Sequence, residues 1–296
     1  MGYSVKAGKN AKKTRGHKAG TAQERVDDLH EMLEDEKVKA IITSLGGYNS
    51  NELLPIIDYE LIRNNPKILC GYSDITFLHC GIYSQTGLVT FYGPHLLVQF
   101  ADFGGPIPYT RNYFEKLLCQ AQPLGRVEPS KEYTCERLEW ESDDVRPRKL
   151  MPAPGWKVLK EGNARGRLVG GHIGTIAGLM GTKYLPSFKD TILFWEDTES
   201  STPETDRLLC QLKMVGVFDQ IRGMIVGRTN PNEYAVFSKE LGLHEIIFEA
   251  TKEYDFPIIA EMDFGHTDPM FTIPYGIEAS INTGKMDFSI IESSVR

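Results

Sequence analysis

Apolar residues along the chain alternate between short continuous runs and longer segments with a helical period. The runs predict buried strands, and the periodic segments predict amphipathic helices. The predicted strands lie at residues 38–45, 68–70, 88–92, 191–197, 223–227 and 257–263. The predicted helices lie at 21–35, 52–62, 202–215 and 243–254, with one more after Ser73. Strands that alternate with helices in this way indicate an α/β fold with a parallel sheet.

The periodic pattern weakens between residues 124 and 154, where charged residues and prolines gather. Two segments outside this region alternate residue by residue: 3–6 predicts a short strand, and 271–291 predicts a β-rich tail. A chain of 296 residues exceeds the usual size of one domain. We therefore expect three parts: a parallel-sheet α/β domain of the flavodoxin-like type (1–123), a linker and catalytic loop (124–160), and a β-rich α/β domain (161–296).

Ser73 lies where a predicted strand meets a predicted helix, directly after Gly71-Tyr72. A hydroxyl at this turn lies beside the free N–H groups and the positive dipole end of the helix. Such a position suits a nucleophile whose reaction passes through an oxyanion. The alternative is that Ser73 is an ordinary N-cap, since serine is common there.

Gly46-Gly47 ends the strand predicted at 38–45, and glycines at such a place let the backbone approach a ligand closely. A simple turn is the alternative. Ligands of open parallel sheets bind beyond the carboxyl ends of the strands, where both Gly47 and Ser73 are expected. The two motifs are therefore predicted to face one pocket.

Glu196 and His266 complete a possible catalytic set in the second half of the chain. Glu196 ends a buried strand, so its carboxylate either caps the next segment or pairs with a cation or an imidazole. His266 follows Gly265 on a turn, where it is free to act as a general base. Serine, acid and histidine in this order are the groups that acyl transfer needs.

Composition and charge exclude several classes of function. The formal net charge of −7 argues against non-specific nucleic-acid binding, which needs a basic surface. The five cysteines are odd in number and lack CxxC spacing, so neither a disulfide framework nor a zinc site is predicted. No apolar stretch reaches the roughly 20 residues of a membrane span. We expect a soluble, cytoplasmic protein without a metal or another cofactor.

Several stretches in the right order resemble the LD-carboxypeptidase family, S66 of the serine peptidases. They cover nearly the whole chain. The stretches are 46–48, 65–79, 90–94, 168–171, 181–184, 193–197 and 265–266. The resemblance implies that Ser73 is the nucleophile, that Glu196 and His266 complete the triad, and that the N–H groups of Gly47 and Asp74 form the oxyanion hole.

Within this family the chain resembles the microcin C self-immunity branch, because the segment before Glu196 is long and carries Trp140. The resemblance implies cleavage of the amide between an acidic residue and the nucleotide of a peptidyl- or aminoacyl-nucleotide, with Trp140 stacked on the base. An exposed tryptophan in a polar loop also fits stacking, although packing onto the domain below is the alternative. The substrate-binding residues that we expect are Trp140, Gly46, His172 and Glu233. His172 stands where an asparagine is usual.

Other functions are compatible with the sequence. A muropeptide LD-carboxypeptidase uses the same chemistry on a terminal D-residue, and a two-domain binding protein closes on a small ligand without reaction. A metal hydrolase using His266 lacks paired-histidine spacing. Family members carry an additional strand and helix ahead of the segment that starts here, so we expect the first sheet to lack this unit. Apolar surface left uncovered there favours a homodimer.

Overall fold

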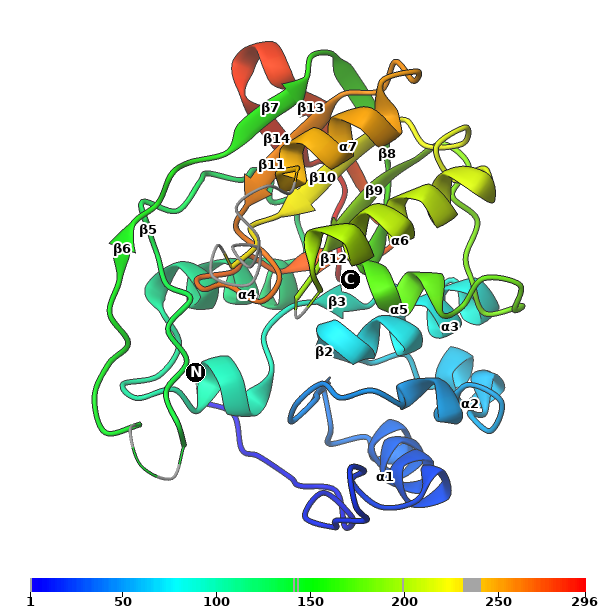
Figure 1. Cartoon of the computed structure of the whole chain (residues 1–296). Coiled ribbons are helices and arrows are strands. Elements are labelled where there is room, and N and C mark those ends of the chain that lie inside the picture. Colours follow the sequence, from blue (N-terminus) through cyan, green and yellow to red (C-terminus); the bar gives the residue numbers. More distant parts are fainter. Residues whose placement is uncertain (1, 141, 143, 199, 231–240) are drawn as a thin grey trace.

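Two sheets form the framework of the protein, which is described by a computed structural model covering residues 2–140, 142, 144–198, 200–230 and 241–296 (Figure 1). The smaller sheet has the strand order β1-β2-β3-β12. Its strands are β1 (Ala40–Ile42), β2 (Ile68–Gly71), β3 (Phe91–Tyr92) and β12 (Ile273–Pro274). The first three strands are parallel, and β12 pairs antiparallel with β3. A segment from the end of the chain thus completes the first sheet.

The larger sheet has eight strands in the order β4-β14-β13-β8-β9-β10-β11-β7. Its central strands β8 to β11 run parallel, and antiparallel strands flank them on both sides. The strands are β4 (Gly125–Arg126), β7 (Lys157–Lys160), β8 (Asn163–His172), β9 (Thr191–Glu196), β10 (Gly223–Gly227), β11 (Ile258–Met262), β13 (Glu278–Asn282) and β14 (Asp287–Ile290). The predicted α/β fold with parallel strands and a β-rich second half is confirmed.

Helices cover the sheets (Figure 1). They are α1 (Ala22–Glu34), α2 (Tyr59–Asn64), α3 (Thr76–Thr86), α4 (Pro108–Cys119), α5 (Ile173–Ala177), α6 (Thr202–Met214) and α7 (Leu243–Thr251). Thr21 and Glu24 form the capping box that starts α1, as their spacing predicts. None of the helices in the described ranges has the length and apolar character that crossing a membrane requires.

Three local predictions are wrong, each for a physical reason. The helix predicted at 52–62 is broken, because Pro55 lacks an N–H and Asp58 caps a new helix by accepting the N–H groups of Glu60 and Leu61. Residues 3–6 form no strand. Val215, expected to face inward, is 51% exposed because α6 ends at Met214.

The basic N-terminal segment lies against α1. Lys6 pairs with Asp35 at 2.8 Å, and Lys13 pairs with Glu24 at 2.6 Å. These ion pairs neutralise the lysines locally.

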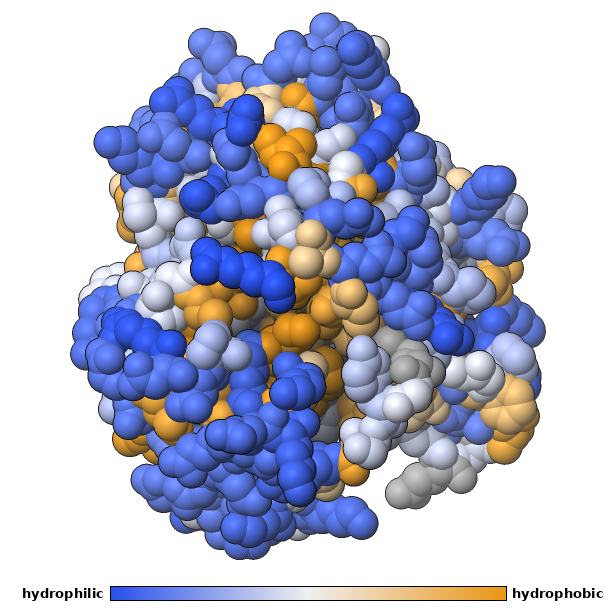
Figure 2. All heavy atoms as spheres, turned by 180° about the vertical axis from the view of Figure 1, so that it is seen from behind, coloured by the Kyte–Doolittle hydropathy of each residue, from blue (hydrophilic) through white to orange (hydrophobic). Residues whose placement is uncertain are grey.

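On the face opposite to the view of Figure 1, hydrophilic residues cover most of the surface and hydrophobic ones gather in a central band (Figure 2).

The linker predicted at 124–160 is built largely of irregular chain. It contributes β4 and β7 to the larger sheet, and β5 (Glu132–Tyr133) pairs with β6 (Met151–Pro152) as a separate ribbon. The domain boundaries at 123 and 160 stay predictions.

Strands β8 and β9 lie at the centre of the larger sheet and approach each other closely. Gly170 of β8 pairs with Phe194 of β9, and a Cβ atom on Gly170 would lie 1.7 Å from the Phe194 carbonyl oxygen. Only glycine fits between these backbones. Since the pair also aligns His172 with Glu196, this contact sets where both side chains emerge.

We expect Gly170→Ala to lower the free energy of unfolding by about 3 kcal/mol or more, because the clash is with backbone. Chemical denaturation measures this. Gly242→Ala is the control, since a Cβ atom there meets only the end of the Glu245 side chain, at 3.5 Å, and should cost about 1 kcal/mol or less. Equal stability losses in both variants would contradict the close-approach argument.

Candidate active site

Ser73 lies at a sharp turn between β2 and α3. It starts a short 3₁₀ helix (Ser73–Ile75), and its φ of 61° is unusual for a residue other than glycine. The N-cap of that helix is Tyr72, so the alternative that Ser73 serves as the cap does not hold. A Cβ atom on Gly46 would lie 3.0 Å from the Ser73 Cβ atom. The absence of a side chain at Gly46 therefore leaves the serine accessible.

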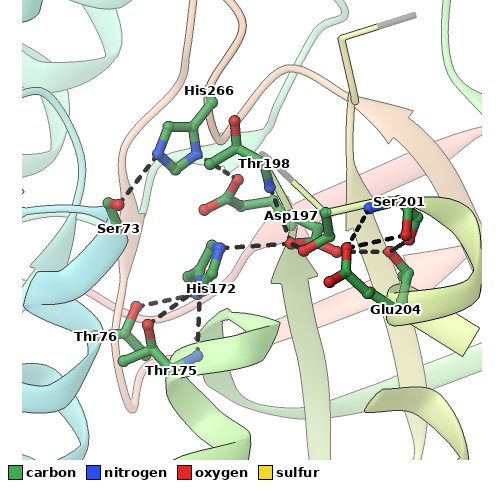
Figure 3. Close-up of polar contacts among 12 residues, drawn as sticks. Ser73, Thr76, His172, Thr175, Asp197, Thr198, Ser201, Glu204 and His266 are labelled. Atoms are coloured by element: carbon green, nitrogen blue, oxygen red, sulfur yellow. Dashed lines mark hydrogen bonds and ion pairs between the residues drawn. The ribbon is translucent and has the colours of Figure 1, made fainter. Parts of the chain in front are cut away.

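His266 links Ser73 to Glu196, and Figure 3 shows its contact with Ser73. The His266 Nε2 atom lies 3.1 Å from Ser73 Oγ, and its Nδ1 atom lies 2.7 Å from a carboxylate oxygen of Glu196. The three side chains come from the ends of β2 and β9 and from the turn after β11. The structure thus brings together three residues that the sequence separates by up to 193 positions.

Gly265 allows His266 to reach this position. Its φ is 100°, and a Cβ atom there would lie 2.8 Å from the Cβ atom of Glu196. Both the backbone conformation and the close contact require glycine. The predicted glycine-flanked turn therefore has a geometric cause.

Glu196 is fully buried, yet it is held as a carboxylate. Burial works to raise its pKa, but the charge and hydrogen bond of His266, the charge of His172 and the hydrogen bond of Tyr92 outweigh it and lower the pKa to about 2. Glu196 therefore stays ionised at neutral pH. It pairs with an imidazole, one of the two partners expected for it.

Two aromatic side chains hold the backbone just before and at Ser73, and sequence reasoning assigned neither a role. The Tyr72 N–H donates to His95 Nε2 at 3.0 Å, and the Ser73 N–H donates to the Tyr92 hydroxyl at 3.2 Å. Burial, with the charge of His266, lowers the pKa of His95 to about 3, so His95 accepts as a neutral ring. In the sequence, the only feature that links Tyr92 and His95 is that they flank Gly93-Pro94.

Asp74 ties the turn to the loop that carries Gly46 and Gly47. Its carboxylate accepts the Ser50 N–H at 2.9 Å, the Ser50 hydroxyl at 2.6 Å and the Asn49 N–H at 3.2 Å. Gly47 lies beside it, since a Cβ atom there would be 3.7 Å from the Asp74 carboxylate. The two residues predicted to supply oxyanion donors are therefore neighbours.

A cleft of about 1190 Å³ opens over Ser73. Six of the predicted site residues line it besides Ser73: Gly46, Gly47, Asp74, Trp140, His172 and His266. Trp140 is 57% exposed, so it is not packed onto the domain below. Glu233 lies outside the described residues.

Arg148 anchors the segment that carries Trp140. Its guanidinium contacts Asp102 at 2.7 Å and Asp268 at 2.8 Å, and all three side chains are largely buried. Asp268 lies two residues after His266, and its backbone also pairs with Thr134. The ion pairs of Arg148 and the backbone pairing of Thr134 fasten both sides of the Trp140 segment next to the His266 turn.

His172 lies at the start of α5, on the wall of the cleft (Figure 3). When the ring is neutral, its Nδ1 atom accepts the Thr175 N–H at 3.3 Å; when it is protonated, Nδ1 donates to the Thr175 hydroxyl at 3.1 Å. Its Nε2 atom lies 3.5 Å from Asp197, and its ring centre is 6.0 Å from that of His266. Burial works to lower its pKa, but the hydrogen bond and charge of Asp197 and the charges of Glu196 and Asp74 raise it overall. His172 is therefore a second imidazole on the wall of the cleft, with a pKa above its ordinary value.

Within the described part of the chain, no three histidine, cysteine, aspartate or glutamate side chains are grouped closely enough to hold a metal ion. The arrangement of Ser73, His266 and Glu196 suits nucleophilic acyl transfer.

Comparison with known proteins gives the family. Residues 1–93 match the model of the LD-carboxypeptidase N-terminal domain, and residues 165–281 match that of the C-terminal domain. The microcin C7 self-immunity protein MccF of Escherichia coli is 33% identical over 98% of this chain and 85% of its own length. The putative carboxypeptidase YocD of Bacillus subtilis is 38% identical, over 97% of this chain and 87% of its own.

Solved structures of MccF and of an MccF-like protein also match this chain. MccF in complex with glutamyl sulfamoyl guanosine matches with a TM-score of 0.89 and 32% identity, covering 98% of this chain and 86% of that one. An MccF-like protein from Bacillus anthracis matches with a TM-score of 0.87 and 37% identity, covering 96% and 86%. The chain belongs to the LD-carboxypeptidase family, S66 of the serine peptidases.

Proposed function

We propose that Ser73, His266 and Glu196 are the catalytic triad of this serine carboxypeptidase. The observation that carries the proposal is the continuous hydrogen-bonded line from Ser73 Oγ through His266 to Glu196, at 3.1 and 2.7 Å. His266 Nε2 takes the hydroxyl proton as Ser73 Oγ bonds to the substrate carbonyl carbon. The C–N bond then breaks, and the leaving nitrogen takes that proton. Water releases the acyl group by the reverse route.

The oxyanion donors in this proposal are the N–H groups of Gly47 and Asp74. The Ser73 N–H donates to Tyr92, so it is already engaged. Asp74 follows the nucleophile directly, where the N–H of a nucleophile turn commonly serves. The Asp74 carboxylate supports the arrangement by holding the 46–50 loop against the turn.

Ser73→Ala should lower kcat about 10⁴-fold or more, because no acyl-enzyme forms without the hydroxyl. The assay measures hydrolysis of aspartyl sulfamoyl adenosine as the rate at which aspartate is released. Ser84→Ala is the matched control, because the Ser84 hydroxyl donates within α3 to Gly81, away from the cleft. Wild-type turnover in Ser73→Ala would remove Ser73 from the mechanism.

We propose further that the substrate is a peptidyl- or aminoacyl-nucleotide with an acidic residue at the cleaved amide. MccF structures contain glutamyl sulfamoyl guanosine and aspartyl sulfamoyl adenosine. In this chain the exposed ring of Trp140 lines the same cleft as Ser73. A base stacks on such a ring whatever its identity.

Trp140→Ala should raise KM for aspartyl sulfamoyl adenosine about 10- to 100-fold, because the stacking contact is lost. Trp140→Phe keeps an aromatic face and should raise KM less. A muropeptide tetrapeptide has no base, so its hydrolysis should not respond. An equal loss with both substrates would speak against a nucleotide-stacking role.

His172 is our candidate for the acidic side chain of the substrate. It lies on the cleft wall one ring away from His266, and its raised pKa favours a cation that pairs with a carboxylate. The Asp197 carboxylate behind it holds that charge in place. Gly46 and Glu233 stay in the proposed binding set, Gly46 because it lies directly over Ser73.

The pKa of His172 is raised above the ordinary imidazole value of about 6.5, so KM for aspartyl sulfamoyl adenosine should rise once the pH exceeds this raised pKa, because the imidazolium is lost. Steady-state kinetics between pH 6 and 9 measure this. His172→Asn should flatten the dependence, and asparaginyl sulfamoyl adenosine, which lacks the carboxylate, should show none with the wild type. The same pH dependence of KM in His172→Asn would refute this role.

A muropeptide carboxypeptidase is the second candidate. A probable murein peptide carboxypeptidase of Bacillus subtilis is 33% identical over 100% of this chain and 84% of its own length. Faster turnover of a tetrapeptide than of the nucleotide would favour it. Binding of both without product would favour a binding protein. The cytoplasmic location and the homodimer stay predictions.

A further inference from the structure

Tyr92 is a fully buried residue whose hydroxyl touches two parts of the catalytic arrangement. The hydroxyl donates to the Glu196 oxygen Oε1, opposite the one that contacts His266. It also accepts the Ser73 N–H at 3.2 Å. Tyr92 does not line the cleft in the part of the chain that the structure describes.

Strand pairing fixes this residue from both sides. Tyr92 pairs with Gly71 of β2 and with Ile273 of β12. The Phe194 ring meets its ring edge-on at 5.4 Å. A side chain held this firmly delivers its hydroxyl to one place, so the two contacts form without a large loss of side-chain entropy.

The first contact serves the acid. A buried carboxylate needs hydrogen bonds to both oxygens, and removing one partner leaves a charge only partly satisfied. Burial and the nearby charge of Glu196 raise the pKa of Tyr92 well above its usual range, so the hydroxyl keeps its proton and always donates. Phenylalanine has no group that could replace it.

The second contact serves the nucleophile. Ser73 has a positive φ, which costs a residue with a Cβ atom about 1–2 kcal/mol and persists only where the surroundings impose it. The bond from its N–H to Tyr92 is one of the contacts that impose it. A hydroxyl donates and accepts at the same time, so one oxygen connects the acid to the backbone of the nucleophile.

We propose that Tyr92 is a positioning residue that sets the geometry of Ser73 and Glu196 together. The inference rests on the proposed triad. It requires that loss of the hydroxyl lowers kcat while KM is kept, because Tyr92 lies behind the reacting groups and outside the cleft.

The test is Tyr92→Phe with aspartyl sulfamoyl adenosine as substrate. We expect kcat to fall about 10- to 100-fold with KM unchanged within about twofold, the size typical of a lost hydrogen bond to a charged group. The loss should grow at low pH, because removing the Tyr92 hydrogen bond raises the pKa of Glu196 and its carboxylate is then protonated more easily. Unchanged kcat, or a change in KM alone, would overturn the inference.

Tyr275→Phe is the matched control. Tyr275 is also fully buried, and its hydroxyl contacts Cys80 Sγ at 3.4 Å, away from the triad. We expect it to keep kcat. An equal fall of kcat in this variant would make the effect of Tyr92→Phe a general consequence of losing a buried hydroxyl and would overturn the positioning role.

Two further measurements separate the possible failures. Replacing Tyr92 by 4-aminophenylalanine keeps a donor for Glu196, but its nitrogen is a weak acceptor for the Ser73 N–H. We therefore expect kcat to lie between the values of Tyr92→Phe and the wild type, and this variant tests the role even if Tyr92→Phe does not fold. No recovery with this residue would count against the inference. Ser73→Ala is assayed in parallel: if it stays active, the triad assignment fails, whereas an inactive Ser73→Ala with a fully active Tyr92→Phe removes only the role of Tyr92.

Discussion

The structure depends on keeping one carboxylate charged in the interior. Glu196 is fully buried at the end of β9, and breaking a buried pair of this kind typically costs about 3–5 kcal/mol. His266 satisfies one of its oxygens and Tyr92 the other. These two partners come from the turn after β11 and from β3, so the charge can be satisfied only when the two sheets are packed together.

The same packing imposes the conformation of Ser73. Ser73 has a left-handed backbone conformation, which is unfavourable for serine unless the surroundings impose it. The N–H groups of Tyr72 and Ser73 donate to His95 and Tyr92, which come later in the chain than β2. Because Gly46 and Gly265 have no side chains, Ser73 and the His266 imidazole can approach their partners. The strain and the close approach found at the site therefore help to hold these side chains in place.

The sequence predicted the α/β fold and most elements because period and length are local properties. Helix α4 was not predicted, although Tyr113, Phe114, Leu117 and Leu118 have a helical spacing and are buried. The two short helices on either side of Pro55 were predicted as one. The positions of Ser73, Glu196 and His266 at strand ends could be predicted from the sequence. The contacts of Tyr92 and His95 could not, because a buried tyrosine or histidine is indistinguishable from a core residue until its partners are known.

The most direct test of the account is to trap the acyl-enzyme. The wild type is mixed rapidly with aspartyl sulfamoyl adenosine and quenched in acid, and intact-protein mass spectrometry is followed by peptide mapping. If Ser73 is the nucleophile, the peptide that contains it gains the mass of one aspartyl group. Turnover with an adduct on another residue, or sustained turnover with none at any quench time, would contradict it.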